Sequence, residues 1–189
     1  MNYKWLRMLC GCVFLGGLLL SAVAAFATDD PLVTIDPKYN QAVLDHPNDP
    51  RSFFNRANAW LEQQQFQHAL ADYNSALVIN PEFANALFNR GFTRRMLKQY
   101  DLAMLDYNAV LLLHPEDVDA LNNRAILQCL MQNYFAAQLD FDRALQIDPK
   151  NAHVLLNRKL LGEAIQQRQT VIQRTDQLDL EDSYIRFGE

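Results

Sequence analysis

The chain has 189 residues, of which 50% are hydrophobic and 21% are charged. This is the composition of an ordinary globular protein, and it excludes a chain that is disordered throughout. The formal net charge of −5 at pH 7 argues against nucleic acid as a partner, because an acidic surface repels phosphate backbones.

Residues 1–27 have the features of an export signal. Lys4 and Arg7 form a positive head, an uncharged apolar stretch follows, and small residues at alternate positions, Ala25 and Ala27, end it. The alternative is an uncleaved anchor, because about 20 uncharged residues suffice to span a bilayer. The sequence therefore predicts an exported protein, periplasmic or secreted. The segment is either a signal peptide cleaved after Ala27 or an N-terminal membrane anchor, and it is the only part of the chain expected to touch a membrane.

Two of the three cysteines, Cys10 and Cys12, lie inside this segment. A cleaved chain keeps only Cys129 and can form no intrachain disulfide. We expect Cys129 to act as a small buried hydrophobe and not as a reactive thiol.

After the segment, the sequence repeats itself every 34 residues. Four prolines keep this interval: Pro47, Pro81, Pro115 and Pro149. An aromatic residue stands eight positions before each of them: Tyr39, Tyr73, Tyr107 and Phe141. Twelve positions before the last three prolines stand Ala69, Ala103 and Ala137. Small residues let two helices approach while aromatic rings fill the space beside them, and a proline ends the second helix. Each unit is therefore predicted to be a helical hairpin.

Three full repeats are expected over 50–151, at 50–83, 84–117 and 118–151. Their first helices are predicted at 51–63, 84–97 and 118–131, and their second helices at 66–79, 100–113 and 134–147. A half-repeat at 36–47 would cap the N-terminal end of the stack, and a polar-backed helix at 152–175 would cap the C-terminal end. Residues 176–189 have no clear period and are predicted to form a mobile tail.

The period, the terminal prolines and the Ala-x-x-x-aromatic motif resemble the tetratricopeptide repeat family. The motif occurs as Ala69 to Tyr73, Ala103 to Tyr107 and Ala137 to Phe141. The resemblance implies an all-α fold, a right-handed α-solenoid of antiparallel helix hairpins, in which the first helices line a concave groove.

One departure from the family recurs, because arginine replaces the usual leucine at three equivalent positions: Arg56, Arg90 and Arg124. Each repeat also carries an aspartate on its second helix: Asp72, Asp106 and Asp140. We expect each arginine to pair with one of these aspartates, within its repeat or across to the neighbouring one, and to fix the helix register.

The groove is the predicted binding site. Helical spacing places four equivalent asparagines along it: Asn55, Asn89, Asn123 and Asn157. An amide offers both a donor and an acceptor, so such a row could hold an extended peptide by its backbone. The alternative is that duplication copied one harmless surface residue. Asn58, Phe92 and Arg95 complete the candidate site, and Arg95 with the aromatic pair Phe88 and Phe92 would add a mixed apolar and weakly basic patch.

Some family members hold the C-terminal carboxylate of chaperones with a clamp of two lysines, one arginine and two asparagines. Asn58 and Asn89 occupy the asparagine places, but the basic places hold Phe54, Asp119 and Asn123. The sequence therefore does not predict recognition of a chaperone tail by this clamp.

No enzyme motif is present, and the four histidines lack metal-ligand spacing. We therefore expect a non-catalytic protein-protein interaction module without cofactor or metal, which binds a peptide segment or partner subunit in its groove on the periplasmic or extracytoplasmic side. The alternative is a structural assembly or oligomerisation component of an envelope complex, which includes self-association.

Overall fold

The structure is a computed structural model that describes residues 34–186, with side chains through Arg174. The predicted signal or anchor segment, 1–27, lies outside the described residues. Of the described residues, 35–186 belong to one unit. Within the described residues, no helix is both long and apolar enough to cross a membrane.

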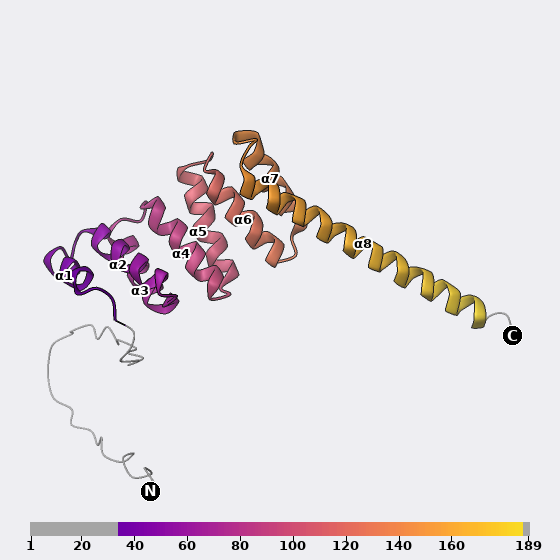
Figure 1. Ribbon diagram of the computed structural model, residues 1–189, viewed down its shortest axis with the longest axis horizontal. Helices are drawn as coiled ribbons and strands as arrows, with labels where there is room; N and C mark the ends of the chain where they lie inside the picture. The colour runs from indigo at the N-terminus through magenta and orange to yellow at the C-terminus, as the bar shows by residue number, and fades with distance from the viewer. Residues whose placement is uncertain (1–33, 187–189) are drawn as a thin grey trace, which may run out of the picture. The chain divides into compact units, whose positions relative to one another are not determined.

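The described part of the chain consists of helices joined by short turns. In order they are α1 (Pro37–Asp45), α2 (Pro50–Glu62), α3 (Phe66–Ile79), α4 (Ala84–Met96), α5 (Tyr100–Leu113), α6 (Val118–Leu130), α7 (Tyr134–Ile147) and α8 (Ala152–Arg186). The six helices of the predicted hairpins are confirmed, and each observed end lies within one residue of its predicted position. Each helix packs against the next one in the chain, as Figure 1 shows, so the predicted α-solenoid is confirmed.

The turn inside each hairpin has the same backbone conformation. Gln64, Lys98 and Gln132 are 34 residues apart and have φ angles of 59°, 59° and 62°, in the left-handed region. In each case the next residue donates its N–H back to the end of the first helix, for example Gln65 to the Trp60 carbonyl at 2.9 Å. This hydrogen bond satisfies a carbonyl that the helix end would leave open. The turn therefore stops the first helix at a fixed point and starts the second.

The repeating small residues lie where the helices approach most closely. Ala57, Ala69 and Tyr73 are fully buried between α2 and α3. In the second hairpin a glycine takes the place of Ala57, because a Cβ on Gly91 would lie 3.1 Å from Cε1 of Tyr107. The pattern that predicted the hairpins is therefore the pattern of their core.

The C-terminal helix differs from its prediction. Helix α8 continues to Arg186, so its predicted end at 175 is wrong, and residues 176–186 of the predicted tail are helical. The physical reason is that no proline follows Pro149, and the only glycine after Gly162 is Gly188. Nothing in the intervening sequence stops the helix.

The predicted arginine–aspartate pairs are confirmed, and each lies within one hairpin. Arg56 Nη2 lies 2.6 Å from Asp72, Arg90 Nη2 lies 2.7 Å from Asp106, and Arg124 Nη2 lies 2.7 Å from Asp140. The aspartate side chains are between 2% and 9% exposed. These pairs therefore fix the register of the first helix against the second.

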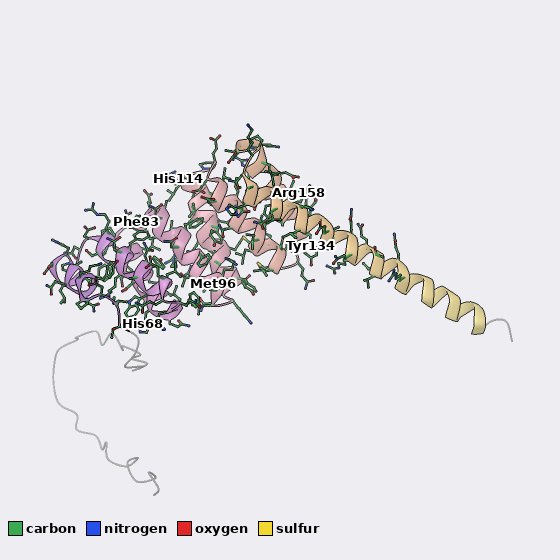
Figure 2. The ribbon with its side chains drawn as sticks, in the orientation of Figure 1. His68, Phe83, Met96, His114, Tyr134 and Arg158 are labelled. Carbon is green, nitrogen blue, oxygen red and sulfur yellow. The ribbon has the colours of Figure 1, made fainter. Side chains whose placement is uncertain are left out.

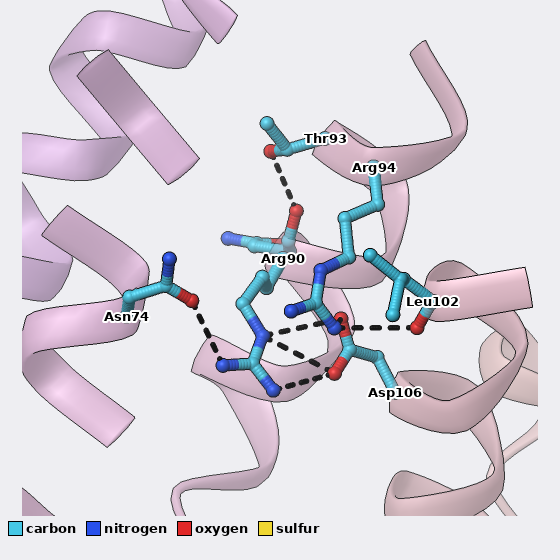
Figure 3. A network of polar contacts seen from close by, with 7 residues as sticks. Asn74, Arg90, Thr93, Arg94, Leu102 and Asp106 are labelled. Carbon is cyan, nitrogen blue, oxygen red and sulfur yellow. Dashed lines mark hydrogen bonds and ion pairs between the residues drawn. The ribbon is translucent and has the colours of Figure 1, made fainter. Parts of the chain in front are cut away.

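Each of these arginines also contacts the preceding second helix. Nη1 of Arg56, Arg90 and Arg124 donates to Asn40, Asn74 and Asn108, at 3.2, 3.0 and 2.8 Å. Figure 3 shows the middle example, in which Arg94 adds a second ion pair to Asp106 at 2.7 Å. The guanidinium therefore joins one hairpin to the next as well as the two helices of its own hairpin.

The junction with α8 uses a different pair. Arg158 has an arginine, Arg174, where the earlier repeats have their aspartate, and Asp142 stands where they have asparagine. Arg158 Nε donates to Asp142 at 2.7 Å, beside α7 (Figure 2). The carboxylate has thus moved to the neighbouring hairpin, and the arginine keeps a counter-ion.

Candidate functional site on the first helices

The candidate site is the face of α2 and α4 formed by Phe54, Asn58, Phe88, Asn89, Phe92 and Arg95, which we call the first-helix face. Asn58 and Asn89, on neighbouring first helices, lie in direct contact. Asn89 Nδ2 donates to Asn58 Oδ1 at 2.9 Å, and Tyr73 Oη donates to the same oxygen at 2.6 Å. Both lone pairs of that oxygen are used. The Asn58 amide nitrogen and the Asn89 oxygen are the donor and acceptor that this pair can offer to a ligand.

Tyr73 fixes this amide pair from the buried side, through its hydrogen bond to Asn58. Its side chain is fully buried, and burial raises the pKa of its hydroxyl well above the usual range. The hydroxyl is therefore a neutral donor near pH 7, and it fixes which end of the Asn58 amide is the oxygen. The asparagine row alone did not mark Tyr73 as part of the site.

A signal for Tyr73 existed in the repeat columns. The positions equivalent to Asn58 hold Phe92 and Ile126, and the position equivalent to Tyr73 is tyrosine in the second repeat and phenylalanine in the third. Of the three repeats, only the first combines a tyrosine with an asparagine that can accept a hydrogen bond from it.

In the second repeat, the same place is aromatic and basic. Arg95 lies over the Phe92 ring, with its guanidinium carbon 4.9 Å from the ring centre. Tyr107 is fully buried, and neither its hydroxyl nor Arg95 Nε has a hydrogen-bond partner among the described residues. Burial raises the pKa of Tyr107 to about 12, and the charge of Arg95 partly opposes this shift.

The four asparagines of the predicted row have different surroundings. Asn55 is exposed, and Asn89 is bound to Asn58. Asn123 Nδ2 donates to the Asp119 carbonyl of its own helix at 2.9 Å. Asn157 Nδ2 donates to Asn122 on the neighbouring first helix, also at 2.9 Å. The row is therefore not a ladder of four equivalent open amides, and its member Asn89 pairs with Asn58, which is not part of the row.

A pocket of about 190 Å³ opens beside this face, between α4, the end of α5 and the start of α6. Asn85 and Phe88 line it from α4, and Asp117 and Asp119 from the α6 side. Asp117 is engaged as the cap of α6, since it accepts from the Ala120 N–H at 2.8 Å. The pocket is thus acidic at the place where a chaperone-tail clamp would need a lysine.

Residues 50–83, which comprise α2, α3 and the turn that follows them, match the sequence pattern of the family described as Tetratricopeptide repeat. Residues 50–83 of this chain are thus identified as a tetratricopeptide repeat. Among curated proteins, no sequence matches it.

Solved tetratricopeptide repeat structures resemble the chain in fold. The first TPR of Spaghetti (RPAP3), bound to the HSP90 peptide SRMEEVD, is 19% identical, with a TM-score of 0.58, over 70% of this chain and 98% of that one. A tetratricopeptide repeat protein from Parabacteroides merdae is 29% identical, with a TM-score of 0.61, over 65% of this chain and 49% of that one. MamA from Desulfovibrio magneticus is 19% identical, with a TM-score of 0.65, over 77% and 82%.

Proposed function

We propose that this protein is a non-catalytic interaction module that binds an extended peptide segment of a partner on its first-helix face. The amide pair of Asn58 and Asn89 is the observation that carries the proposal. It presents one donor and one acceptor, held in place by Tyr73, and a peptide backbone offers the complementary acceptor and donor. Preorganised groups lose little side-chain entropy on binding.

The surroundings of the pair suggest the side chains of the ligand. Phe88 and Phe92 continue the face on α4, so an apolar residue of the peptide would pack there. Arg95, held over Phe92, would meet a carboxylate of the ligand. We therefore propose a peptide with an apolar residue followed by an acidic one. The RPAP3 domain supports the mode of binding, since it holds an acidic peptide on a similar fold.

The test begins with a random heptapeptide library displayed on phage and selected against the immobilised full chain. Enriched peptides are then synthesised with a fluorophore and titrated by anisotropy. Asn58→Ala combined with Asn89→Ala should weaken binding roughly thirtyfold, because two hydrogen bonds of about 1 kcal/mol each are lost. Arg95→Gln should weaken the binding of peptides with an acidic residue. It should leave unchanged the binding of the same peptides with asparagine or glutamine in place of that residue. Asn133→Ala, at an exposed asparagine in the turn before α7, is the matched control.

Circular dichroism checks that each variant keeps its helices. If no peptide is enriched, or if the double variant binds as tightly as the parent, the first-helix face is not the binding site.

We also propose that the protein works in an extracytoplasmic compartment, to which residues 1–27 would direct it. The charged head and apolar stretch of that segment support the proposal. A β-lactamase fused after Glu189 should confer resistance only if the chain is exported. N-terminal sequencing then distinguishes a chain that begins at Thr28 from one that keeps Met1 as part of an anchor. A second candidate role, in the assembly of an envelope complex, is favoured by the length and exposure of α8.

A further inference from the structure

Helix α8 is longer than the stack requires. It has 35 residues, whereas α7, on which it packs, has 14. Leu161 is buried and Ile165 packs against the same core, but every residue from 166 to 174 is exposed. The helix then runs on to Arg186, as Figure 1 shows. A single helix is marginally stable in water, so this length would gain stability from a second helix laid against it.

Apolar residues recur every seven positions along this part of α8. They are Ala164, Val171, Leu178 and Ile185. Val171 is 63% exposed and its neighbour Ile172 is 50% exposed, so the stripe is on the surface where the structure describes it. A seven-residue period keeps one face of a helix turned toward a partner helix over several turns. The pattern therefore indicates a helix as the partner.

The charges along α8 show which helix fits. The stretch 166–175 carries two basic residues, Arg168 and Arg174, and no acid. The stretch 176–182 carries four acids and no base: Asp176, Asp179, Glu181 and Asp182. Two copies of α8 in parallel would place like charges side by side. In an antiparallel pair, the basic stretch of each copy lies against the acidic stretch of the other.

The apolar stripe and the charges agree on one antiparallel register. When position 171 lies opposite position 178 of the second copy, position 164 lies opposite 185. The same register places Arg168 opposite Glu181, and Glu163 opposite Arg186. Apolar layers then alternate with layers of opposite charge. Such pairing is weak for its length, and salt weakens it further because the ion pairs are exposed.

We propose that residues 164–185 of α8 form an antiparallel helix pair with the same residues of a second copy of this chain. The pairing would leave the first-helix face of each copy unused, so the proposal does not depend on peptide binding. Two faces carried by one dimer would raise the avidity for a partner that presents two copies of the peptide.

The test measures the mass of the full chain, in a mild non-ionic detergent, by sedimentation velocity over a range of concentrations. Arg168→Glu should raise the dimer dissociation constant about tenfold, because a dimer contains two Arg168–Glu181 pairs and the change turns both into repulsions. Adding Glu181→Arg should restore the dimer. Arg143→Glu, the same charge change at an exposed position of α7, should have no effect.

A second pair of variants tests the apolar stripe. Val171→Glu with Leu178→Glu should leave the chain monomeric, whereas Gln169→Glu with Gln173→Glu adds the same charge to the opposite face of α8 and should leave it dimeric. A chain that stays monomeric at all concentrations overturns the proposal. So does a dimer that is insensitive to the stripe variants, or one in which Glu181→Arg fails to rescue Arg168→Glu.

Discussion

The replacement of Asp140 by asparagine tests the polar junction between hairpins. Nε and Nη2 of Arg124 donate to the two oxygens of Asp140 at 2.8 and 2.7 Å, and Nη1 donates to Asn108 at 2.8 Å. The Asp140 side chain is 9% exposed and that of Arg124 is 24% exposed. Asparagine keeps the shape of the side chain but removes its charge, so the guanidinium loses its counter-ion in a largely dry site.

Removing one partner of a fully buried ion pair costs roughly 3–5 kcal/mol. Because water still reaches about a quarter of Arg124, we expect a loss near the lower end, about 3 kcal/mol. For a domain of this size, that corresponds to a melting temperature lowered by roughly 6–12 °C. Asp142→Asn is the matched control, because the Arg158–Asp142 pair is 31% and 43% exposed and should contribute less than about 1 kcal/mol.

The assay is urea unfolding followed by circular dichroism, with Arg124→Leu, Asp140→Leu and the double variant completing a thermodynamic cycle. Exchanging the two residues, Arg124→Asp with Asp140→Arg, should recover part of the loss caused by either single exchange. If the single effects simply add, or if Asp140→Asn is as stable as the parent, the pair does not fix the register. Asp106→Asn should cost more than Asp140→Asn, since Asp106 neutralises two arginines.

Lys98→Gly should raise the free energy of unfolding by about 0.5–1 kcal/mol, because Lys98 is exposed and has a φ of 59°, which glycine adopts without strain. Lys159→Gly, inside α8, should lower the free energy of unfolding by a similar amount. A loss of stability in both variants would contradict this prediction. Tyr73→Phe should lower the free energy of unfolding by about 1 kcal/mol, because the hydrogen bond from the Tyr73 hydroxyl to Asn58 is lost. Tyr107→Phe should be neutral or stabilising, because the Tyr107 hydroxyl is buried without a hydrogen-bond partner. Equal urea midpoints for the two variants would refute this contrast. Because the folded-state pKa of Tyr107, about 12, lies above its unfolded value near 10, ionisation of this hydroxyl favours unfolding, so the parent keeps its full stability below pH 10 and loses part of it as the pH rises through about 12. Urea midpoints measured between pH 9 and 11.5 should therefore fall less steeply in Tyr107→Phe than in the parent, and identical slopes would show that the hydroxyl is not linked to folding.

The hairpins could be predicted from the sequence because the same positions carry the same physical role in every repeat. Pro81 and Pro115 end second helices, and Ala69 and Ala103 mark close helix contacts. The arginine–aspartate pairs followed from the same columns, because two opposite charges at a constant separation recur three times. Because three repeats carry the same pattern, the helix boundaries are better defined than they would be from the sequence of a single helix.

Features that depend on one copy of the repeat were harder to predict. The asparagine row looked uniform in sequence, but Asn123 bonds to its own helix while Asn157 reaches across to Asn122. The hydrogen-bond partner of an amide depends on atomic distances between helices, and the spacing of residues along the sequence does not give these distances. The end of α8 was missed for another reason, since its sequence has no repeat column for comparison and a helix without a stop signal can end anywhere.

The junction chemistry also makes the order of the hairpins meaningful. At an internal boundary an asparagine and an aspartate share one arginine, so the hairpins α2–α3 and α4–α5 carry interchangeable connectors. Helix α7 ends this series, because Asp142 supplies the negative charge that α8 lacks at the equivalent position, where Arg174 stands. If a copy of α7 were inserted between two internal hairpins, one arginine would contact two carboxylates, the inserted equivalent of Asp142 and the aspartate of its own hairpin. Only a second arginine, placed as Arg94 is beside Asp106, could balance the extra negative charge. The chain therefore encodes where its array must terminate, and an engineer who wishes to lengthen it should insert new hairpins before α6.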